Sequence, residues 1–200
     1  MTEESFQKQW SAMASKFQGT ADKLGMNIDE KIIDTFVALN LLGISTTQSC
    51  EGHLDHSLAG PWVILGVPNT SEVDEISKLS NQAYQEAEEI KGANPTTFIN
   101  DPRYGKSMDN YRDLYQKTLI PTKDNILKII PLLDDFYHNR NTPVISRLIL
   151  SDIDSNVPRL HNQGLYLQEM SSPEAKAQNL QNFQTEFISF TEFLKQKLHQ

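Results

Sequence analysis

The sequence TTQSCEGHLDH, residues 46–56, holds the only cysteine of a 200-residue chain and two of its five histidines. The residues that lead into it, from Ile44 to Ser49, are rich in β-branched side chains and are typical of a short strand. The run PWVILGV at residues 61–67 is almost wholly apolar and indicates a second, interior strand. Gly52 suits a tight turn, because glycine adopts positive φ without steric cost. The stretch is therefore predicted to form a loop held between two buried strands.

Apolar side chains recur every three or four residues on both sides of this loop, which is the spacing of amphipathic helices. The second helix is expected to start at a cap of Asn27 or Asp29. The last begins at Ser172 and Pro173, a serine cap followed by proline at the first helical position. Pro131 is expected to kink or divide its helix, since it removes a backbone donor. The predicted helices cover residues 6–24, 27–43, 71–90, 108–119, 122–140 and 172–194.

Two more strands are predicted near the C-terminus, over residues 146–153 and 159–170, with turn residues at 154–156 between them. Residues 93–105 are expected to form a loop. The resulting order is α-α-β-β-α-α-α-β-β-α, which predicts a single α+β domain over residues 1–200. We expect a small, mainly antiparallel sheet of about four strands with helices packed against it. The phenylalanine-rich face of the last helix is expected to lie in the core.

The formal net charge is −8, from 26 acidic and 18 basic residues, and the basic residues are scattered. Nonspecific nucleic-acid binding depends on clustered Lys and Arg, so no broad nucleic-acid surface is expected. No apolar run approaches the roughly 20 residues that span a bilayer. The acidic, polar start MTEESFQKQW is unlike a signal peptide. These features predict a soluble, cytoplasmic protein without a membrane segment, and they leave its oligomeric state open.

The loop carries metal-ligand chemistry. Cys50, His53 and His56 follow a C-x-x-H-x-x-H spacing, and zinc favours thiolate and imidazole ligands. A further ligand would come from His138, His161 or an acidic residue. Zinc is therefore a candidate cofactor at this loop.

Two other interpretations of the same residues stay open. Cys50 is a candidate catalytic nucleophile with His53 or His56 as its base, because a nearby imidazole activates a thiol. Alternatively Cys50 is a small buried hydrophobic residue, and the polar residues around it only hydrogen-bond a turn. Five titratable or nucleophilic groups between two buried strands exceed what a turn requires, so a ligand pocket is favoured.

Several polar residues are candidates for contacting a ligand there. Arg147 and Arg159 flank the C-terminal strand pair, and Arg159 and His161 share one strand face. An arginine fork suits a carboxylate or phosphate, which favours a small anionic ligand, although surface ion pairs would also account for these arginines. The candidate ligand-binding residues are Ser49, Glu51, Trp62, Arg147, Arg159 and His161. The sequence thus indicates a small-molecule enzyme or binding protein, or else a noncatalytic interaction or regulatory module whose loop is structural or metal-clamped.

Two resemblances add to this interpretation. The segments SCEGHLDH (49–56), PWV (61–63), RLIL (147–150), RLHNQG (159–164) and FTEFLK (190–195) together resemble a family of small bacterial proteins of uncharacterised function. Over about residues 27–66, IDEKIIDTFVALN followed by TTQSCEG is similar to the start of the wybutosine-synthesis tRNA methyltransferase family, which has arginine where His53 stands here. That resemblance implies S-adenosylmethionine as cofactor and methyl transfer to a modified guanosine in tRNA.

Overall fold

The structure is a computed structural model that describes residues 2–18, 28–55, 58–66, 71–152 and 157–199. It confirms the α+β class and the order of the elements. The helices are α1 (Glu3–Gln18), α2 (Glu30–Leu41), α3 (Ser71–Ala93), α4 (Pro102–Tyr137) and α5 (Pro173–Leu198), and the strands are β1 (Thr46–Cys50), β2 (Trp62–Leu65), β3 (Leu148–Asp152) and β4 (Pro158–Asn162). None of the described helices is long and apolar enough to cross a membrane.

Contacts along the chain divide it into two compact units, where the sequence suggested one domain without a linker. The first, which we call the sheet unit, consists of residues 1–66 and 124–200. The second, the hairpin unit, consists of residues 67–123. The sheet unit contains all four strands and every described residue that the sequence indicates as a candidate for chemistry.

The four strands form one antiparallel sheet, as predicted, and their order in it is β1-β2-β4-β3. Residues directly opposite each other on antiparallel strands share a face, and neighbours along a strand alternate between faces. One face, which we call the inner face, carries the fully buried Val63 and Leu160. The opposite outer face carries two rows of paired residues, Cys50–Trp62–His161–Ile149 and Gln48–Ile64–Arg159–Ser151.

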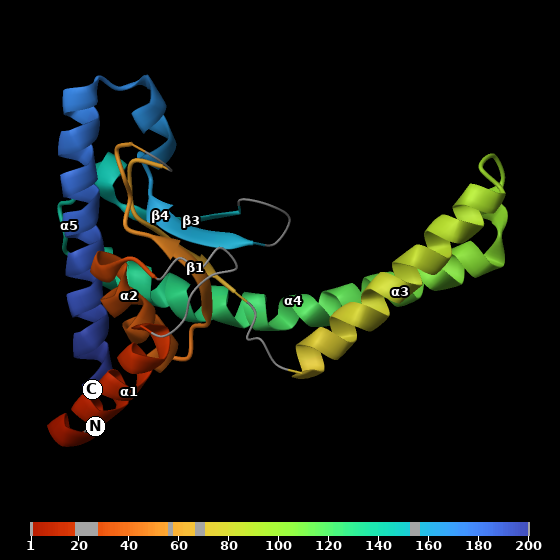
Figure 1. The fold of residues 1–200 in the computed structure, drawn as a ribbon, viewed down its shortest axis with the longest axis horizontal. Coiled ribbons are helices and arrows are strands. Elements are labelled where there is room, and N and C mark those ends of the chain that lie inside the picture. The colour runs from red at the N-terminus through yellow and green to blue at the C-terminus, as the bar shows by residue number, and fades with distance from the viewer. Residues whose placement is uncertain (1, 19–27, 56–57, 67–70, 153–156, 200) are drawn as a thin grey trace. The chain divides into compact units, whose positions relative to one another are not determined.

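The inner face is covered by α2, α5 and the last turns of α4 (Figure 1). The phenylalanines of α5 lie in this core as expected, with Phe187 and Phe190 almost fully buried. Phe190 meets Phe136 of α4 edge-to-face at a centroid distance of 5.1 Å, a favoured geometry for aromatic pairs. Thr35 and Thr191 join α2 to α5 through a buried hydroxyl contact of 2.7 Å. The hydrophobic burial that stabilises the unit is therefore concentrated on one side of the sheet.

The expected division of the helical region between 108 and 140 is wrong. Residues 102–137 form the single helix α4, which continues through Pro121 and Pro131. A proline in a helix interior removes one backbone hydrogen bond and costs about 3 kcal/mol. Buried residues on both sides of Pro131, Ile129 and Phe136, hold the helix against the core. Tertiary packing thus outweighs the local penalty, which a sequence pattern does not reveal.

The strand predicted over residues 159–170 is confirmed only over its first residues, 159–162. It ends at Asn162, and residues 165–170 form a 3-10 helix instead. At Gly164, where the chain has left the strand, the backbone passes so close to Ile145 that an added Cβ would lie 2.9 Å from it. Only glycine fits there without a shift of the neighbouring atoms. The start of α5 is as predicted, because the Ser172 hydroxyl accepts the Ala175 N–H at 3.2 Å. The predicted turn at 154–156 lies outside the described residues.

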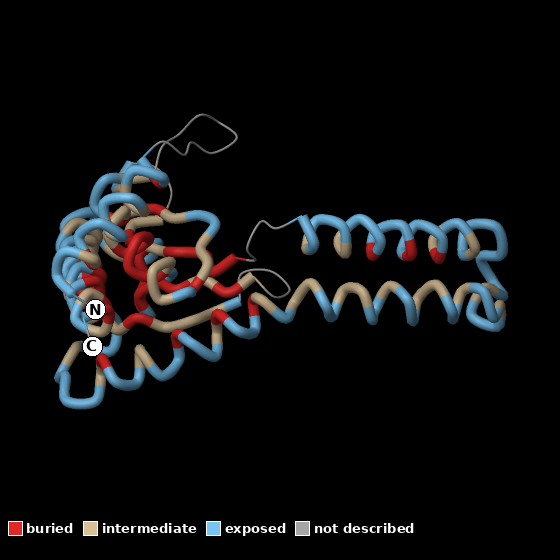
Figure 2. The backbone as a smooth tube through the Cα atoms, turned by 90° about the horizontal axis from the view of Figure 1, so that it is seen from below, coloured by how far each residue is buried: buried red, intermediate tan, exposed pale blue. Residues whose placement is uncertain are grey.

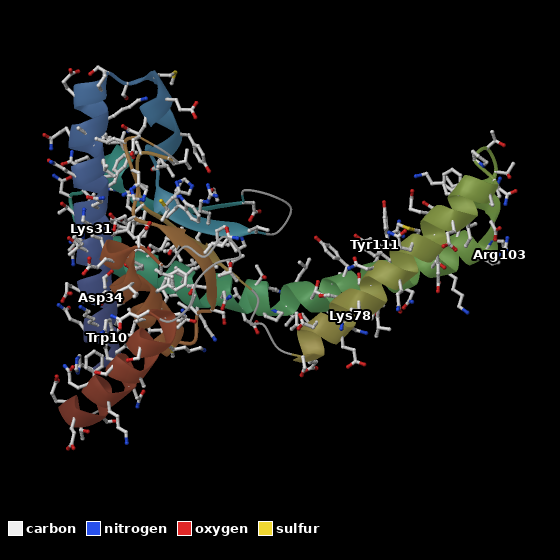
Figure 3. The ribbon with its side chains drawn as sticks, in the orientation of Figure 1. Trp10, Lys31, Asp34, Lys78, Arg103 and Tyr111 are labelled. Carbon is white, nitrogen blue, oxygen red and sulfur yellow. The ribbon has the colours of Figure 1, made fainter. Side chains whose placement is uncertain are left out.

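The hairpin unit is built from α3 and the first part of α4, joined through a short 3-10 turn at Phe98–Asn100. The buried residues of α3 lie on its side toward α4 (Figure 2); they are small, namely Ser80, Ala83 and Ala87. Tyr111, labelled in Figure 3, lies between Tyr84 and Tyr115 at ring distances of 5.2 and 5.7 Å. The residues expected to form a loop at 93–105 include the 3-10 turn and the first turn of α4.

Asn125 generates a stability prediction for the sheet unit. Its buried side chain accepts the Ser45 N–H at 3.0 Å and donates to the Gly66 carbonyl at 2.6 Å, so it ties α4 to the start of β1 and the end of β2. Asn125→Ala leaves both backbone groups without this partner and is expected to lower the free energy of unfolding by about 2–4 kcal/mol. Urea denaturation followed by circular dichroism measures this.

The neighbouring Asp124 is exposed and provides the control. Asp124→Ala is expected to change the free energy of unfolding by less than about 0.5 kcal/mol. Equal stability of the two variants would show that Asn125 does not hold these strands.

Candidate functional site

The candidate site lies where the chain leaving β1 meets the first turn of α2. Asp29 occupies the N-cap position of α2, but its side chain makes no cap hydrogen bond within the helix. Instead, its Oδ2 accepts the Glu51 N–H at 2.9 Å. In return, the Glu51 carboxylate accepts the backbone N–H of Lys31, labelled in Figure 3, at 3.1 Å. The loop and the helix therefore cap each other, and α2 gains an acceptor for one of its unpaired N–H groups.

Gly52 makes the turn that brings this loop back over the sheet. Its φ is +84°, and an added Cβ would lie between 2.6 and 2.8 Å from the backbone of Gly60. Gly60 itself leaves no room for a Cβ beside Phe183 of α5. The Gln184 amide also donates to the Glu51 carbonyl at 3.0 Å. The prediction of a tight turn at Gly52 is confirmed, and the loop is fixed on both sides.

This arrangement brings Asp29, Cys50 and His53 together. One candidate ligand atom from each residue lies within 4.8 Å of the others. His53 Nε2 is 3.4 Å from Asp29 Oδ2. The Cys50 Sγ accepts the Gly52 N–H at 3.3 Å. Cys50 is 7% exposed, whereas the side chains of His53 and Asp29 are 25% and 30% exposed, so the cluster has one buried and two accessible members.

The sequence found two of these three residues. Cys50 and His53 were proposed as metal ligands and as a nucleophile–base pair, and the structure places them together. Asp29 was identified only as a helix cap, although an acidic residue was among the expected further ligands. The metal-ligand cluster found in the described residues includes neither His138 nor His161. His56, the remaining predicted ligand, lies outside the described residues.

Arg159 lies on the outer face of the sheet. Its guanidinium carbon is 4.5 Å from the centre of the Trp62 ring, a cation–π stack. Its Nη1 donates to the Tyr166 hydroxyl at 3.2 Å. Tyr166 comes from the 3-10 helix after β4 and also meets the His161 ring edge-to-face at 5.3 Å. Trp62, Arg159 and His161, predicted from sequence as ligand-binding, thus form one cluster.

His161 is held in its neutral form by its surroundings. Burial lowers the pKa of His161, and the neighbouring Arg159 charge lowers it further, against a hydrogen bond to the Asn162 carbonyl that raises it. Nδ1 lies 2.8 Å from that carbonyl and so carries the hydrogen. Nε2 is therefore the acceptor for the Ser151 hydroxyl, 2.7 Å away.

The remaining predicted ligand-binding residues lie apart from this cluster. Arg147 is stacked over Tyr137 at 5.7 Å and donates to the Thr142 carbonyl at 3.1 Å. Ser49 is paired with Val63 and so belongs to the inner face. Glu51 caps α2 and forms a 3.8 Å ion pair with the side chain of Lys31. Arg147 and Arg159 therefore contact different residues, Arg147 the Tyr137 ring and Arg159 the Trp62 ring.

Comparison with family models, with curated proteins and with solved structures finds no match to this chain. The methyltransferase resemblance therefore rests on residues 27–66 alone. Two of the cavities in the described part of the chain are not lined by Asp29, Cys50 or His53. One, of about 400 Å³, is lined by Ile130 and Leu133 of α4 and by β3. The other, of about 350 Å³, lies within the hairpin unit beside Leu79 and Leu114.

Gly52 generates the first prediction for this site. Gly52→Ala forces a side chain into a positive-φ position and against the Gly60 backbone, and is expected to destabilise the protein by about 2–4 kcal/mol. Gly92→Ala is the matched control, since an added Cβ at that helical position meets nothing within 4 Å. Thermal unfolding should show a lowered midpoint for the first variant and an unchanged or raised one for the second. A normal midpoint for Gly52→Ala would mean that the loop is not constrained at this turn.

His161 generates a prediction about pH. Its folded-state pKa lies below the unfolded value of about 6.5, so between these values the unfolded chain binds more protons. Stability is therefore expected to fall as the pH drops below about 6.5. His161→Gln should show a shallower fall in the free energy of unfolding between about pH 7.5 and pH 5.5. Parallel curves for the two proteins would contradict a neutral, buried His161.

Proposed function

We propose that Asp29, Cys50 and His53 bind a transition-metal ion, Zn²⁺ first among them, and that this centre binds and acts on a small molecule. The observation that carries the proposal is the 3.4 Å distance between His53 Nε2 and Asp29 Oδ2. Two ligands each about 2.0–2.1 Å from one tetrahedral ion lie about 3.3 Å apart. The imidazole and the carboxylate are thus already spaced as two ligands of a tetrahedral site.

The cysteine completes the ligand set with a small movement. Its sulfur lies within 4.8 Å of the other two ligand atoms, and a tetrahedral Zn²⁺ site requires about 3.5 Å, so it approaches by at most about 1.3 Å. The Gly52 N–H already donates to this sulfur at 3.3 Å. Asp29 at the N-terminus of α2 is also well placed, because the helix dipole favours negative charge there.

The accessibility of the cluster supports a centre that acts on a ligand rather than a closed structural clamp. Three protein ligands leave one tetrahedral position for water or substrate, as in catalytic zinc sites. The side chains of His53 and Asp29 are 25% and 30% exposed, so solvent or a small molecule can reach these two ligands. We further propose a cytoplasmic location. We also propose that no broad nucleic-acid surface exists, since the net charge of −8 and the scattered basic residues disfavour binding along a nucleic-acid backbone.

Metal titration tests the proposal. Chelator-treated protein is titrated with Zn²⁺, and metal content after dialysis is measured by elemental analysis. We expect a single Zn²⁺ per chain, with Asp29→Asn, Cys50→Ser and His53→Asn each weakening binding by at least about tenfold. Co²⁺ in place of Zn²⁺ should give a thiolate charge-transfer absorption that Cys50→Ser removes.

The exposed His138, just after α4, provides the matched control. His138→Asn removes an imidazole as His53→Asn does, but it should leave Zn²⁺ affinity unchanged. Absence of stoichiometric Zn²⁺ or Co²⁺ binding by the wild type would refute the proposal. Equal affinities for His53→Asn and His138→Asn would refute this ligand assignment.

A further inference from the structure

The outer face of the sheet carries the positive charge of Arg159, which has no acidic partner among the described residues. Among the residues that the structure describes, no carboxylate forms an ion pair with Arg159. The described contacts of its guanidinium are the Trp62 ring and the Tyr166 hydroxyl. Arg140 of the same unit differs, since it forms a 2.8 Å ion pair with Glu186. Arg159 therefore keeps its charge available on a half-buried face, where a charge gains most from a partner of opposite sign.

Two buried donors beside this charge also have no acceptor. Arg159 Nε and Trp62 Nε1 are buried and make no hydrogen bond with any described residue. Buried donors in native structures are nearly always paired, so two adjacent orphans call for an explanation. The Arg159 and Trp62 side chains are only partly buried, although these two nitrogens do not touch solvent, so an oxyanion reaches them only when the side chains shift.

The hydrogen bonds of the guanidinium show which of its edges is unpaired among the described residues. Nη1 is engaged by Tyr166, while Nε has no partner. The Nε–Nη2 edge is therefore the side on which two parallel N–H groups can meet one oxyanion, a bidentate arrangement that arginine favours.

We propose that Arg159 and Trp62 bind the oxyanion group, a carboxylate or a phosphate, of a small molecule on the outer face of the sheet. The Nε–Nη2 edge of the arginine and the Trp62 indole N–H are the donors. The proposal does not depend on the metal centre, because neither residue belongs to that cluster. The two sites are nevertheless neighbours, because Trp62 pairs directly with Cys50 across β1 and β2. A molecule whose oxyanion is held by Arg159 would extend over the same sheet face toward Cys50.

The test uses inorganic phosphate and acetate as separate probes, each compared with chloride at matched ionic strength. The readout is the indole N–H resonance of Trp62 in a ¹H–¹⁵N correlation spectrum. Trp10 is the other tryptophan of the chain, and Trp10→Phe assigns the two signals. We expect a saturable shift of the Trp62 signal with phosphate, with acetate or with both, which also distinguishes the two oxyanion classes. A response no larger than that to chloride with both probes overturns the proposal.

Variants locate the binding. Arg159→Gln is expected to weaken the saturable response by at least about tenfold, because a charge-assisted bidentate contact is lost. Arg147→Gln is the matched control, since Arg147 is also stacked on an aromatic ring but lies elsewhere, and it should bind as the wild type does. Unchanged binding by Arg159→Gln overturns the assignment. If that variant does not fold, Arg159→Lys, which keeps the charge but lacks the fork, is expected to bind more weakly than the wild type, and equal binding overturns the proposal.

Asp29→Asn separates this proposal from the metal centre. It removes a metal ligand but no part of the Arg159 site, so the phosphate or acetate response should persist. Loss of the response in Asp29→Asn would show that the anion binds at the metal cluster, and would overturn the assignment to Arg159. If Zn²⁺ does not bind the wild type but the Trp62 response is intact, only the proposal of a metal centre is refuted.

Discussion

The first turn of α2 presents backbone N–H groups that no residue within the helix can accept, and the chain leaving β1 supplies an acceptor. Glu51 takes over the capping role, which frees the Asp29 carboxylate to accept the Glu51 N–H and to face His53. A serine or asparagine cap bonded within its own helix would have left no side chain for the cluster. The position of the chemistry thus follows from how one helix end satisfies its hydrogen bonds.

The alternation of side chains along the strands then separates stability from chemistry. The inner face gathers the aliphatic and phenylalanine core under α2, α4 and α5. The outer face is left with a thiol, an imidazole, a guanidinium and an indole. Because a one-residue shift would exchange the two faces, the burial of Val63 and Leu160 also fixes where Cys50 and Arg159 lie. Burial of the inner-face side chains therefore also fixes the positions of the polar side chains on the outer face.

Sequence patterns predicted what is decided locally. The start of α5 at Ser172 and the turn at Gly52 follow from cap and backbone chemistry that a few residues specify. The continuity of α4 through Pro131 could not be predicted, since it depends on burial of side chains against distant elements. Arg147 and Arg159 look alike in sequence, but Arg147 precedes β3 whereas Arg159 lies within β4 on the outer face. Asp29 was visible as a cap, but its meeting with Cys50 depends on how β1 ends in space.

The strand order has a consequence for how the chain folds. The pairs β1–β2 and β3–β4 each join segments close in sequence, whereas the central pair β2–β4 closes a loop formed by residues 66–157. Local pairs form readily, and long-range pairing is slow, so docking of the two strand pairs is expected to limit the folding rate. Loop-closure entropy grows slowly, by about 0.6 kcal/mol for each doubling of length. Changes in the length of the hairpin unit, which lies within that loop, would therefore alter the entropic cost of closing the sheet only slightly.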